Sequence, residues 1–403
     1  MARERLVLVG NGMAGLKFLE EVLELAPGRF DITVIGAEPE PAYNRVLLSS
    51  LLAGEIAAGD VTLKSRAWYG EHGIVLKTGQ PAVALDSARR EVVLADGVTV
   101  PFDVLVLATG SNPIRLDLPG QQLSGVTTFR TLADVADLKA AAGAKTAAVV
   151  IGGGLLGIEA AYGLARRRVP VTLVHLMDRL MERQLDAEGA ALLKDALEAR
   201  GIKVLLQAQT RAIHGEGAVE SVELADGRRI ACGLVVMAVG VRPNVALAAT
   251  GGLQIGRGIL VDDRLQTSVA DIHAIGECVE HRSGCYGLVE PAYEQARVAA
   301  AAIVNKPVSY LGSVLATNLK VSGVPVFSAG DFEGAGAEAI IVRDHGAASY
   351  RKLVIRDGRL AGAALVGDTG DALWYAELIR TAAPVAAFRE ALAFGQAFAE
   401  AMG

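Results

Sequence analysis

Two glycine-rich segments carry the residue types and spacing best suited to chemistry. The first spans residues 6–15 and the second spans residues 147–159, and each has glycines in the pattern G-x-G-x-x-G. In both, a short apolar run that predicts a buried parallel strand leads into the glycines, and a helix follows at once. Such glycines permit a tight turn and let backbone N–H groups approach a pyrophosphate without an intervening Cβ. One motif is a weak signal, but two predict two dinucleotides, and a flavin with a nicotinamide is the usual pair.

The two turns define two groups of predicted cofactor contacts. They are Gly10, Gly12, Met13, Ala14 and Gly15 in the first turn, and Gly152, Gly154, Leu155, Leu156 and Gly157 in the second. A carboxylate near the end of the following strand is expected to bind the ribose hydroxyls. After the strand predicted at residues 30–35 the nearest acid is Glu38, for which a surface loop position is the alternative. At the end of the strand predicted at residues 171–176 stands His175, followed by Asp178 and Arg179, so this pattern does not choose between NADH and NADPH.

The composition is that of a soluble globular protein. The 403 residues suffice for roughly two to three domains, and 52% hydrophobic with 21% charged residues argues against a disordered chain. The net charge of -6 gives no general reason to bind nucleic acid or an anionic membrane. No run of roughly 18 apolar residues predicts a membrane span. Three cysteines are too few for a disulfide framework, so a reducing cytoplasm is the expected location.

A third segment, Tyr43-Asn44-Arg45-Val-Leu-Leu-Ser49-Ser50, interrupts the alternation of predicted strands and helices. A Tyr-Asn-Arg-x-Leu-Leu-Ser segment after a flavin-type first turn resembles the NAD(P)H-dependent flavoprotein family. That family includes the FAD domain of the nitrite reductase large subunit, electron-transfer subunits of assimilatory nitrate reductase, and rubredoxin reductases. The run from Met177 to Asp186 is similar to the nitrite reductase type, which generally uses NADH, so the resemblance favours NADH.

The resemblance implies further cofactor contacts along the chain. They are Arg45 and Ser49 along the flavin, Ala108, Thr109 and Gly110 closing over it, Gly276 and Glu277 at the ribityl chain, Glu290 and Tyr293 in a helix aimed at the pyrimidine, Gly240 in the returning crossover, and Arg130 at the start of a helix. A helix N-terminus beside the flavin pyrimidine would stabilise the negative charge of the reduced ring.

Two residues are predicted to act on the reaction itself. Some relatives carry a lysine at the position of Ser50 that approaches the reactive flavin nitrogen, and this chain lacks it. Lys64 is the candidate substitute, with a solvated lysine as the equal alternative. Glu159, on the helix behind the second turn, matches a glutamate that faces the nicotinamide carboxamide or the flavin in many related reductases. The alternative for Glu159 is an acid that stabilises the helix N-terminus.

Cys278, His281 and Cys285 are close enough in sequence to be weighed as metal ligands. A fourth ligand and Cys-x-x-Cys spacing are both missing, so we predict no metal site. A redox-active disulfide between the two cysteines is disfavoured as well.

These features predict an α/β chain with two Rossmann-like domains, arranged as in glutathione reductase, and a small α+β C-terminal domain. The FAD-binding domain is expected at residues 1–112 and 235–309, the NAD(P)H-binding domain at 113–234, and the C-terminal interface domain at 310–403. In the last of these, strands are expected at residues 350–355 and 360–366, and helices at 372–381 and 384–394.

The expected route of the electrons follows from cysteines that are absent. Related disulfide reductases, NADH oxidases and peroxidases carry cysteine after the first unit, and residues 43–52 contain none. Electrons are therefore expected to leave the flavin directly for an iron–sulfur, rubredoxin or haem partner. The prediction is an FAD-dependent NAD(P)H:acceptor oxidoreductase that serves nitrate or nitrite assimilation or reduces a rubredoxin or ferredoxin, with a homodimer as a further expected partner. A free-standing NADH oxidase or diaphorase and a flavin-bearing regulatory protein are the alternatives.

Overall fold

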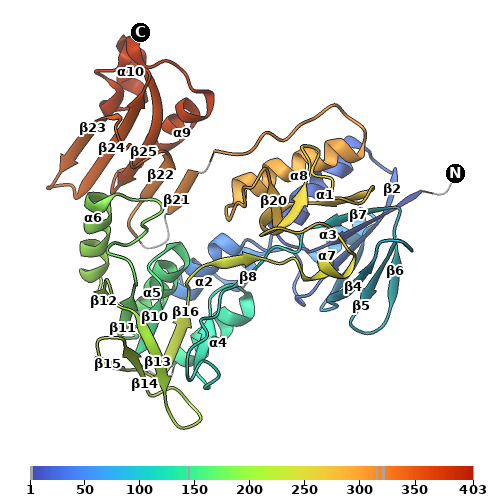
Figure 1. Cartoon of the computed structure of the whole chain (residues 1–403), viewed down its shortest axis with the longest axis horizontal. Helices are drawn as coiled ribbons and strands as arrows, with labels where there is room; N and C mark the ends of the chain where they lie inside the picture. The colour runs from blue at the N-terminus through green and yellow to red at the C-terminus, as the bar shows by residue number, and fades with distance from the viewer. Residues whose placement is uncertain (1–2, 144–145, 315, 320–322, 403) are drawn as a thin grey trace. The chain divides into compact units, whose positions relative to one another are not determined.

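The computed structural model describes residues 3–143, 146–314, 316–319 and 323–402 (Figure 1). The chain divides into two compact units. Unit 1 comprises Met1–Val46, Ala58–Asn112 and Val241–Ser313, and unit 2 comprises Leu47–Ala57, Pro113–Gly240 and Val314–Gly403. Each unit therefore draws on three separate stretches of the chain. The three-domain division expected from the sequence stays a prediction.

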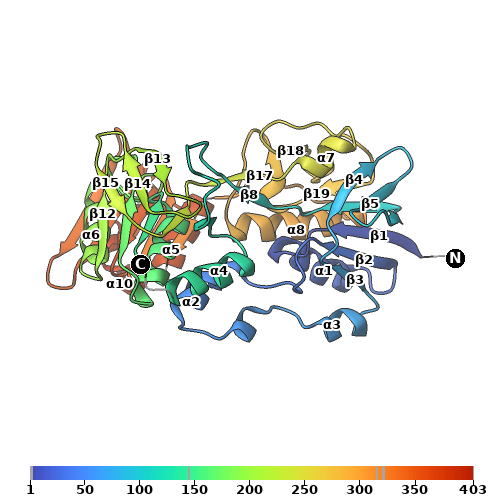
Figure 2. The same ribbon diagram turned by 90° about the horizontal axis from the view of Figure 1, so that it is seen from below.

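A parallel sheet of five strands, in the order β19-β7-β1-β2-β3, forms the centre of unit 1. Because successive side chains of a strand point to opposite faces, β1 serves two cores. Leu6 and Leu8 pack with α1 and α8 on one face, and Val7 and Val9 pack with β4, β5 and α7 on the other. Helices α1 and α8 lie side by side (Figure 2). Both faces are covered, which explains why the strand is apolar throughout its buried part.

The elements of unit 1 are as follows. The sheet strands are β1 (Glu4–Val9), β2 (Phe30–Gly36), β3 (Val75–Thr78), β7 (Val104–Leu107) and β19 (Ile272–Ala274); the other strands are β4 (Ala82–Asp86), β5 (Glu91–Leu94), β6 (Thr99–Pro101), β8 (Ser111–Pro113, which ends at the unit boundary), β17 (Val241–Pro243), β18 (Ile259–Val261) and β20 (Val279–His281). The helices are α1 (Met13–Leu25), α3 (Arg66–Glu71), α7 (Ala246–Thr250) and α8 (Val289–Ile303), with 3-10 turns η1 (Arg45–Leu47, at the unit boundary), η2 (Ala58–Val61) and η3 (Gly276–Cys278).

Unit 2 holds a second parallel sheet of five strands, in the order β12-β11-β10-β16-β9. Its strands are β9 (Val126–Thr128), β10 (Ala148–Ile151), β11 (Val171–Val174), β12 (Ile202–Leu205) and β16 (Leu234–Met237), and a smaller antiparallel sheet contains β13 (Thr210–His214), β14 (Ser221–Leu224) and β15 (Arg229–Ala231). The helices are α2 (Leu48–Ala53), α4 (Leu132–Gly143), α5 (Leu155–Arg166) and α6 (Ala187–Glu198). Helix α2 packs closely on α5, where a Cβ at Gly163 would lie 2.7 Å from Leu52 Cγ.

The last part of unit 2 is an antiparallel sheet in the order β21-β22-β25-β24-β23. The strands are β21 (Ala316–Leu319), β22 (Val326–Gly330), β23 (Glu338–Asp344), β24 (Ser349–Arg356) and β25 (Arg359–Val366), followed by α9 (Ala372–Thr381), η4 (Ala386–Phe388), η5 (Leu392–Phe394) and α10 (Gln396–Met402). Two parallel sheets and a small mixed part confirm the predicted α/β fold class. Among the described residues, no helix has the length and apolar character that crossing a membrane requires.

The helix predicted at residues 384–394 is wrong, because the structure has only the short turns η4 and η5 there. Side chains hold the backbone carbonyls of this stretch. Tyr375 donates its hydroxyl to the Leu392 carbonyl at 2.8 Å, and Arg351 donates to the Ala393 carbonyl at 2.7 Å. Carbonyls engaged in this way favour turns over a continuous helix.

Close packing of α1 on its own turn generates a stability prediction. A Cβ at Gly15 would overlap the carbonyl oxygen of Gly10, whereas a Cβ at Gly12 would meet nothing within 4 Å. We therefore expect Gly15→Ala to lower the unfolding free energy of the flavin-free protein by about 1–3 kcal/mol. The matched control, Gly12→Ala, should change it by less than about 1 kcal/mol. Denaturant unfolding measures both, and equal stabilities would contradict the packing argument.

Candidate functional site

The first glycine turn joins β1 to α1 with its backbone open to a ligand. Gly10 has φ of +112°, and its N–H donates to the Ile35 carbonyl at 2.8 Å. A Cβ at Gly10 would overlap the Ala108 carbonyl, so only glycine fits between β1 and the end of β7. Gly12 is the N-cap of α1 and has open space where a Cβ would point. Met13 and Ala14 form the first turn of α1 and are half-buried.

Two polar side chains near this turn have buried atoms without partners among the described residues, and sequence reasoning missed both. Asn11 accepts the Tyr69 hydroxyl at 2.9 Å on Oδ1, while its Nδ2 is buried and unpaired. Gln80, just after β3, has a buried and unpaired Oε1. Buried polar atoms of this kind normally have partners. An unpaired donor inside a glycine turn therefore fits a ligand that supplies an acceptor. The sequence signal that could have identified Asn11 is its position between Gly10 and Gly12 of the glycine motif.

Glu38 is engaged by side chains from the segment that follows β2. It accepts the Tyr43 hydroxyl at 2.6 Å and forms an ion pair with Arg45, which also lies 4.9 Å from the Tyr43 ring centroid. Burial disfavours the charge of Arg45, but Tyr43, Glu38 and Glu277 outweigh it and raise its pKa. Arg45 and Glu38 thus form one charged cluster. These contacts set the orientation of the Glu38 carboxylate.

Predicted flavin contacts also follow the ends of β7 and β19. Thr109 donates its hydroxyl to the Asn244 carbonyl at 2.7 Å, and Asn244 donates N–H to the carbonyl of Gly110, which has φ of +67°. Glu277, in η3, accepts the Ser111 hydroxyl at 2.7 Å. These bonds bring Ala108, Thr109, Gly110, Gly276 and Glu277 to the carboxyl end of the unit 1 sheet, next to the first turn.

Gly276 is held beside α1 by a buried amide. Its φ is +81°, and its Cβ would lie 3.0 Å from Ala14 Cβ. Its N–H donates to Gln295 Oε1 at 2.7 Å, and Gln295 is 1% exposed. The predicted contact Gly276 is therefore fixed against the first turn by Gln295, a residue that the sequence alone did not single out.

A cavity of about 340 Å³ lies along α1 and α8. Its lining includes Met13, Lys64 and Tyr293. Lys64 forms an ion pair with Glu20 at 2.9 Å, and its ammonium lies 5.1 Å from the Trp68 ring centroid. Lys64 is thus a paired cation at the cavity wall, and its role in tuning the flavin stays a prediction.

The predicted contact Glu290 has a different setting from Tyr293 on the same helix. Glu290 lies in the first turn of α8 with an exposed side chain and an ion pair to Arg297 at 3.6 Å. Tyr293 is half-buried, and burial raises its pKa.

The second glycine turn, in unit 2, repeats the geometry of the first. Gly152 has φ of +118°, and its N–H donates to the Val174 carbonyl at 2.8 Å. A Cβ at Gly157 would overlap the Gly152 carbonyl, while a Cβ at Gly154, the N-cap of α5, would meet nothing within 4 Å. Leu155 and Leu156 form the half-buried first turn of α5. Unit 2 thus contains a second strand, glycine turn and helix of the same geometry.

The side chain of His175, which directly follows β11, bonds to the second glycine turn. Gly153 donates its N–H to His175 Nδ1 at 3.0 Å, so the proton of the neutral ring sits on Nε2. Nε2 lies 3.1 Å from a carboxylate oxygen of Glu182. Glu182, seven positions along the chain, thus places a carboxylate beside His175. The sequence offered no spacing rule for Glu182.

Glu159 is 9% exposed on α5, and burial raises its pKa to about 8. A carboxyl with this pKa is largely protonated at neutral pH, so it can donate one hydrogen bond and accept others.

Three other predicted residues occupy varied places in unit 2. Ser49 is buried in α2, so the boundary after Val46 puts it in a different unit from Arg45. Arg130 donates its backbone N–H to Asp134 at 2.7 Å. Gly240 accepts the Ile114 N–H at 2.9 Å.

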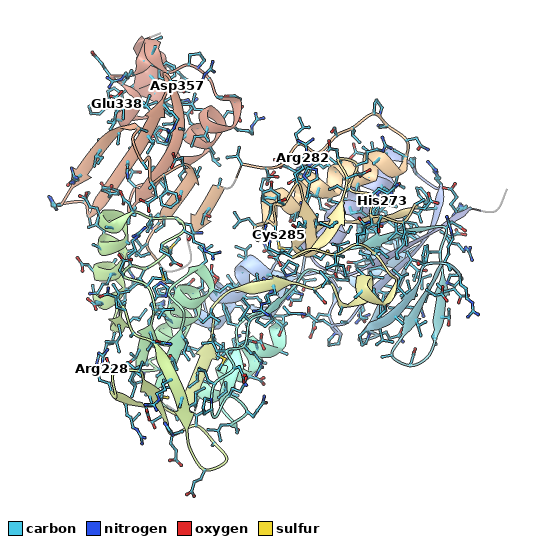
Figure 3. All side chains as sticks on the ribbon, in the orientation of Figure 1. Arg228, His273, Arg282, Cys285, Glu338 and Asp357 are labelled. Carbon is cyan, nitrogen blue, oxygen red and sulfur yellow. The ribbon has the colours of Figure 1, made fainter. Side chains whose placement is uncertain are left out.

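The segment containing Cys278, His281 and Cys285 is built around a charge pair. His281 and Arg282 both bond to Asp263, at 2.8 and 2.6 Å, and Arg282 with His281 lowers the pKa of Asp263 to about 2. Cys278 is buried and donates to the Ile275 carbonyl, and Cys285, labelled with Arg282 in Figure 3, is half-buried. All three cysteines of the chain are free, and the described residues contain no group suited to hold a metal ion.

Comparison with known proteins identifies the family. The pattern of the family described as pyridine nucleotide-disulphide oxidoreductase matches residues 4–302, well over half of the sequence. The chain belongs to this family. The rubredoxin NAD+ reductase C-terminal domain matches residues 316–383, within the antiparallel part of unit 2. The predicted cofactors, FAD and NAD(P)H, and the prediction of an NAD(P)H oxidoreductase are confirmed by this assignment.

Relatives of this oxidoreductase agree with the resemblance drawn from its motifs. Nitrite reductase [NAD(P)H] of Bacillus subtilis (strain 168) is 48% identical over 375 residues, covering 92% of this chain and 46% of the relative. The assimilatory nitrate reductase electron transfer subunit of the same organism is 43% identical, covering 92% and 48%. The chain thus spans about half the length of these relatives. Putidaredoxin reductase, solved as a covalent complex with putidaredoxin, aligns with a TM-score of 0.87 at 26% identity, covering 96% of this chain and 95% of that one.

The residues present fit the two cofactors of the family. Each turn has a glycine whose side-chain space is open, at Gly12 and Gly154, and a helix N-terminus behind it. Asn11 Nδ2 adds an unpaired donor in the first turn. Backbone N–H groups and a helix dipole at these points suit a pyrophosphate.

The raised pKa of Glu159 generates a prediction about stability. From its ordinary value of 4.5 up to about 8, the folded protein holds a proton that the unfolded chain has released. Stability is therefore lost as the pH rises through this window. Glu159→Gln, which is neutral at all pH values, should remove that loss. Its melting temperature should fall less between pH 5 and 8 than that of the parent protein, by roughly 3–6 °C. The surface control Glu216→Gln should follow the parent, and parallel curves for all three would contradict the assignment.

Proposed function

We propose that unit 1 binds FAD, that the glycine turn of unit 2 binds NADH, and that electrons leave the reduced flavin for a protein acceptor. The observation that carries the proposal is the pair of strand, glycine turn and helix sites, one in each unit, with open space at Gly12 and Gly154. A second observation concerns the exit of electrons. Residues 1–231 contain no cysteine, so no redox-active cysteine follows the first turn to take the electrons as a disulfide.

Residues of unit 1 would bind and orient the flavin nucleotide. The first turn supplies N–H groups to the pyrophosphate, Glu38 accepts the adenosine ribose, and Arg45 and Glu277 contact the flavin portion. When bound, FAD accepts a hydride from the nicotinamide and passes electrons on singly. Lys64 and the N-terminus of α8 would add positive potential on the cavity side, Tyr293 would line it, and Thr109 and Gly110 would contact the flavin.

In unit 2, Glu159 would hold the nicotinamide carboxamide. A carboxyl that keeps its proton at neutral pH can donate to the carboxamide oxygen and accept from its nitrogen. NADH is the proposed nucleotide, because a carboxylate at Glu182 repels a 2′-phosphate. Arg179, a cation of the same segment, already bonds to Glu333 at 2.6 Å.

The acceptor we propose is an iron–sulfur protein of the rubredoxin or ferredoxin class, or the catalytic part of a nitrate or nitrite assimilation enzyme. The similarity to a nitrite reductase, to a nitrate reductase electron transfer subunit and to putidaredoxin reductase in its complex with putidaredoxin supports this class. A homodimer is part of the proposal, and so is a cytoplasmic location, which the three free cysteines support.

One pair of variants tests the division of labour between the turns. Gly12 and Gly154 have φ of -92° and -83° and open space at Cβ, so valine at either position fits the fold. Gly12→Val should lose FAD by at least about tenfold in affinity, and Gly154→Val should keep FAD but weaken NADH binding by a similar factor. The flavin absorbance of the purified proteins and their reduction rate by NADH measure the two effects. Equal loss of flavin in both variants would overturn the proposal.

A second experiment tests the nucleotide and the acceptor. Under anaerobic conditions NADH should bleach the flavin at lower concentration than NADPH, and rubredoxin or a [2Fe–2S] ferredoxin should then restore the oxidised spectrum. Fast reoxidation by oxygen or a quinone together with slow reoxidation by both proteins would favour the NADH oxidase or diaphorase alternative. Slow reduction with a redox-dependent change of oligomeric state would favour a regulatory flavoprotein.

A further inference from the structure

The segment between β11 and α6, residues 175–186, contacts the second glycine turn through both backbone groups of Gly153. Gly153 donates its N–H to His175 Nδ1 at 3.0 Å, and its carbonyl accepts the Met181 N–H at 3.0 Å. The contact is too close for a side chain, because a Cβ at Gly153 would lie 2.6 Å from His175 Cγ and 2.7 Å from Leu180 Cδ2. His175 also holds Glu182. A shift of this segment would therefore move Glu182 and the middle of the turn together.

The C-terminal sheet holds the same segment at two points. Arg179, in the middle of the segment, donates to Glu333 at 2.6 Å, in the loop between β22 and β23. Asp186, at its end, accepts the Tyr350 hydroxyl at 2.7 Å and the Lys352 ammonium at 3.1 Å, both from β24. Lys352 also donates to the Glu333 carbonyl at 3.2 Å, which joins the two points into one network.

The part of this network around Asp186 is mostly removed from solvent, whereas the Glu333 side chain is 49% exposed. The side chains of Lys352 and Asp186 are 12% and 14% exposed, and Tyr350 is 1% exposed. Burial alone would raise the pKa of Asp186, but hydrogen bonds from Tyr350, Gly189 and Lys352 outweigh it and lower the pKa. Asp186 is therefore a charged N-cap of α6 whose charge depends on donors from the C-terminal sheet. Charge-assisted bonds to a buried carboxylate are among the strong ones, and losing one partner is costly.

We propose that the C-terminal sheet sets the affinity of the nicotinamide-nucleotide site, with Glu333, Tyr350 and Lys352 as positioning residues for residues 175–186. The inference rests on the proposed function, in which the second glycine turn binds NADH. The three residues act through Arg179 and Asp186 rather than through the turn itself. We call the contacts of Glu333, Tyr350 and Lys352 with Arg179 and Asp186 the clamp. With the clamp in place, residues 175–186 are ordered before NADH binds. Without it, binding must also order the segment, which raises KM and leaves later steps unchanged.

Two variants and one matched control test the clamp in the FAD-loaded protein, with ferricyanide as the electron acceptor. Tyr350→Phe removes the hydroxyl that bonds to Asp186. The double variant Glu333→Gln/Lys352→Met removes the two charged side chains that the C-terminal sheet contributes to the network. We expect KM for NADH to rise roughly tenfold in the double variant and by a smaller factor in Tyr350→Phe. The value of kcat and the FAD content should stay within about twofold of the parent.

Glu188→Gln is the control, because it removes a different ion pair between α6 and the C-terminal sheet. Glu188 lies in the first turn of α6, outside residues 175–186, and pairs with Arg343 of β23. Its KM for NADH should equal that of the parent. The inference is overturned if Tyr350→Phe and the double variant keep the parent KM, or if Glu188→Gln raises KM as much as they do. If the double variant does not fold, Tyr350→Phe decides alone, with NAD⁺ binding by calorimetry as the second readout.

Failure of the clamp and failure of the proposed function give different results. If Gly154→Val abolishes NADH binding while the clamp variants keep the parent KM, only the present inference falls. If Gly154→Val leaves NADH binding intact, the assignment of the second turn falls, whatever the clamp variants do.

Discussion

Backbone contact at the two glycine turns is the constraint on which both dinucleotide sites depend. Gly15 and Gly157 let α1 and α5 lie against the carbonyls of Gly10 and Gly152, at distances that leave no room for a Cβ. That contact aims each helix N-terminus past the end of its sheet, where a pyrophosphate can meet free N–H groups. Parallel strands then converge on the same edge, so β7 and β19 bring Ala108 and Gly276 to the first turn.

Buried polar groups hold the loops around these turns in place. Gln295 fixes the Gly276 N–H, Tyr69 fixes the Asn11 amide, and Tyr43 with Arg45 fixes Glu38. Each of these groups would be costly to bury alone, so each pair or cluster specifies one arrangement. Glu159 is a further buried polar group, and burial raises its pKa. A carboxyl in that condition is typical of a functional position.

In unit 2, polar contacts likewise join residues 175–186 to the C-terminal sheet. Asp186 ends the segment that starts at His175, and it receives donors from Tyr350 and Lys352. The segment thus contacts the glycine turn at one side, and at the other it bonds to residues of the C-terminal sheet and its loop that lie 154 to 166 positions along the chain. In our proposal, the affinity of the nucleotide site therefore depends on two parts of the unit rather than on one turn.

The sequence by itself determined the two dinucleotide turns, the strands before them, the family and the cofactors, because glycine spacing and apolar runs are local signals. It also located the helix at residues 372–381. Only the tertiary structure decided that His175 bonds to the turn, that Glu182 lies beside His175, and that Asn11 keeps an unpaired donor among the described residues. The same holds for the failed helix at residues 384–394, where Tyr375 and Arg351 take the carbonyls. In each case the partners are set by long-range packing, which leaves no fixed spacing in the chain.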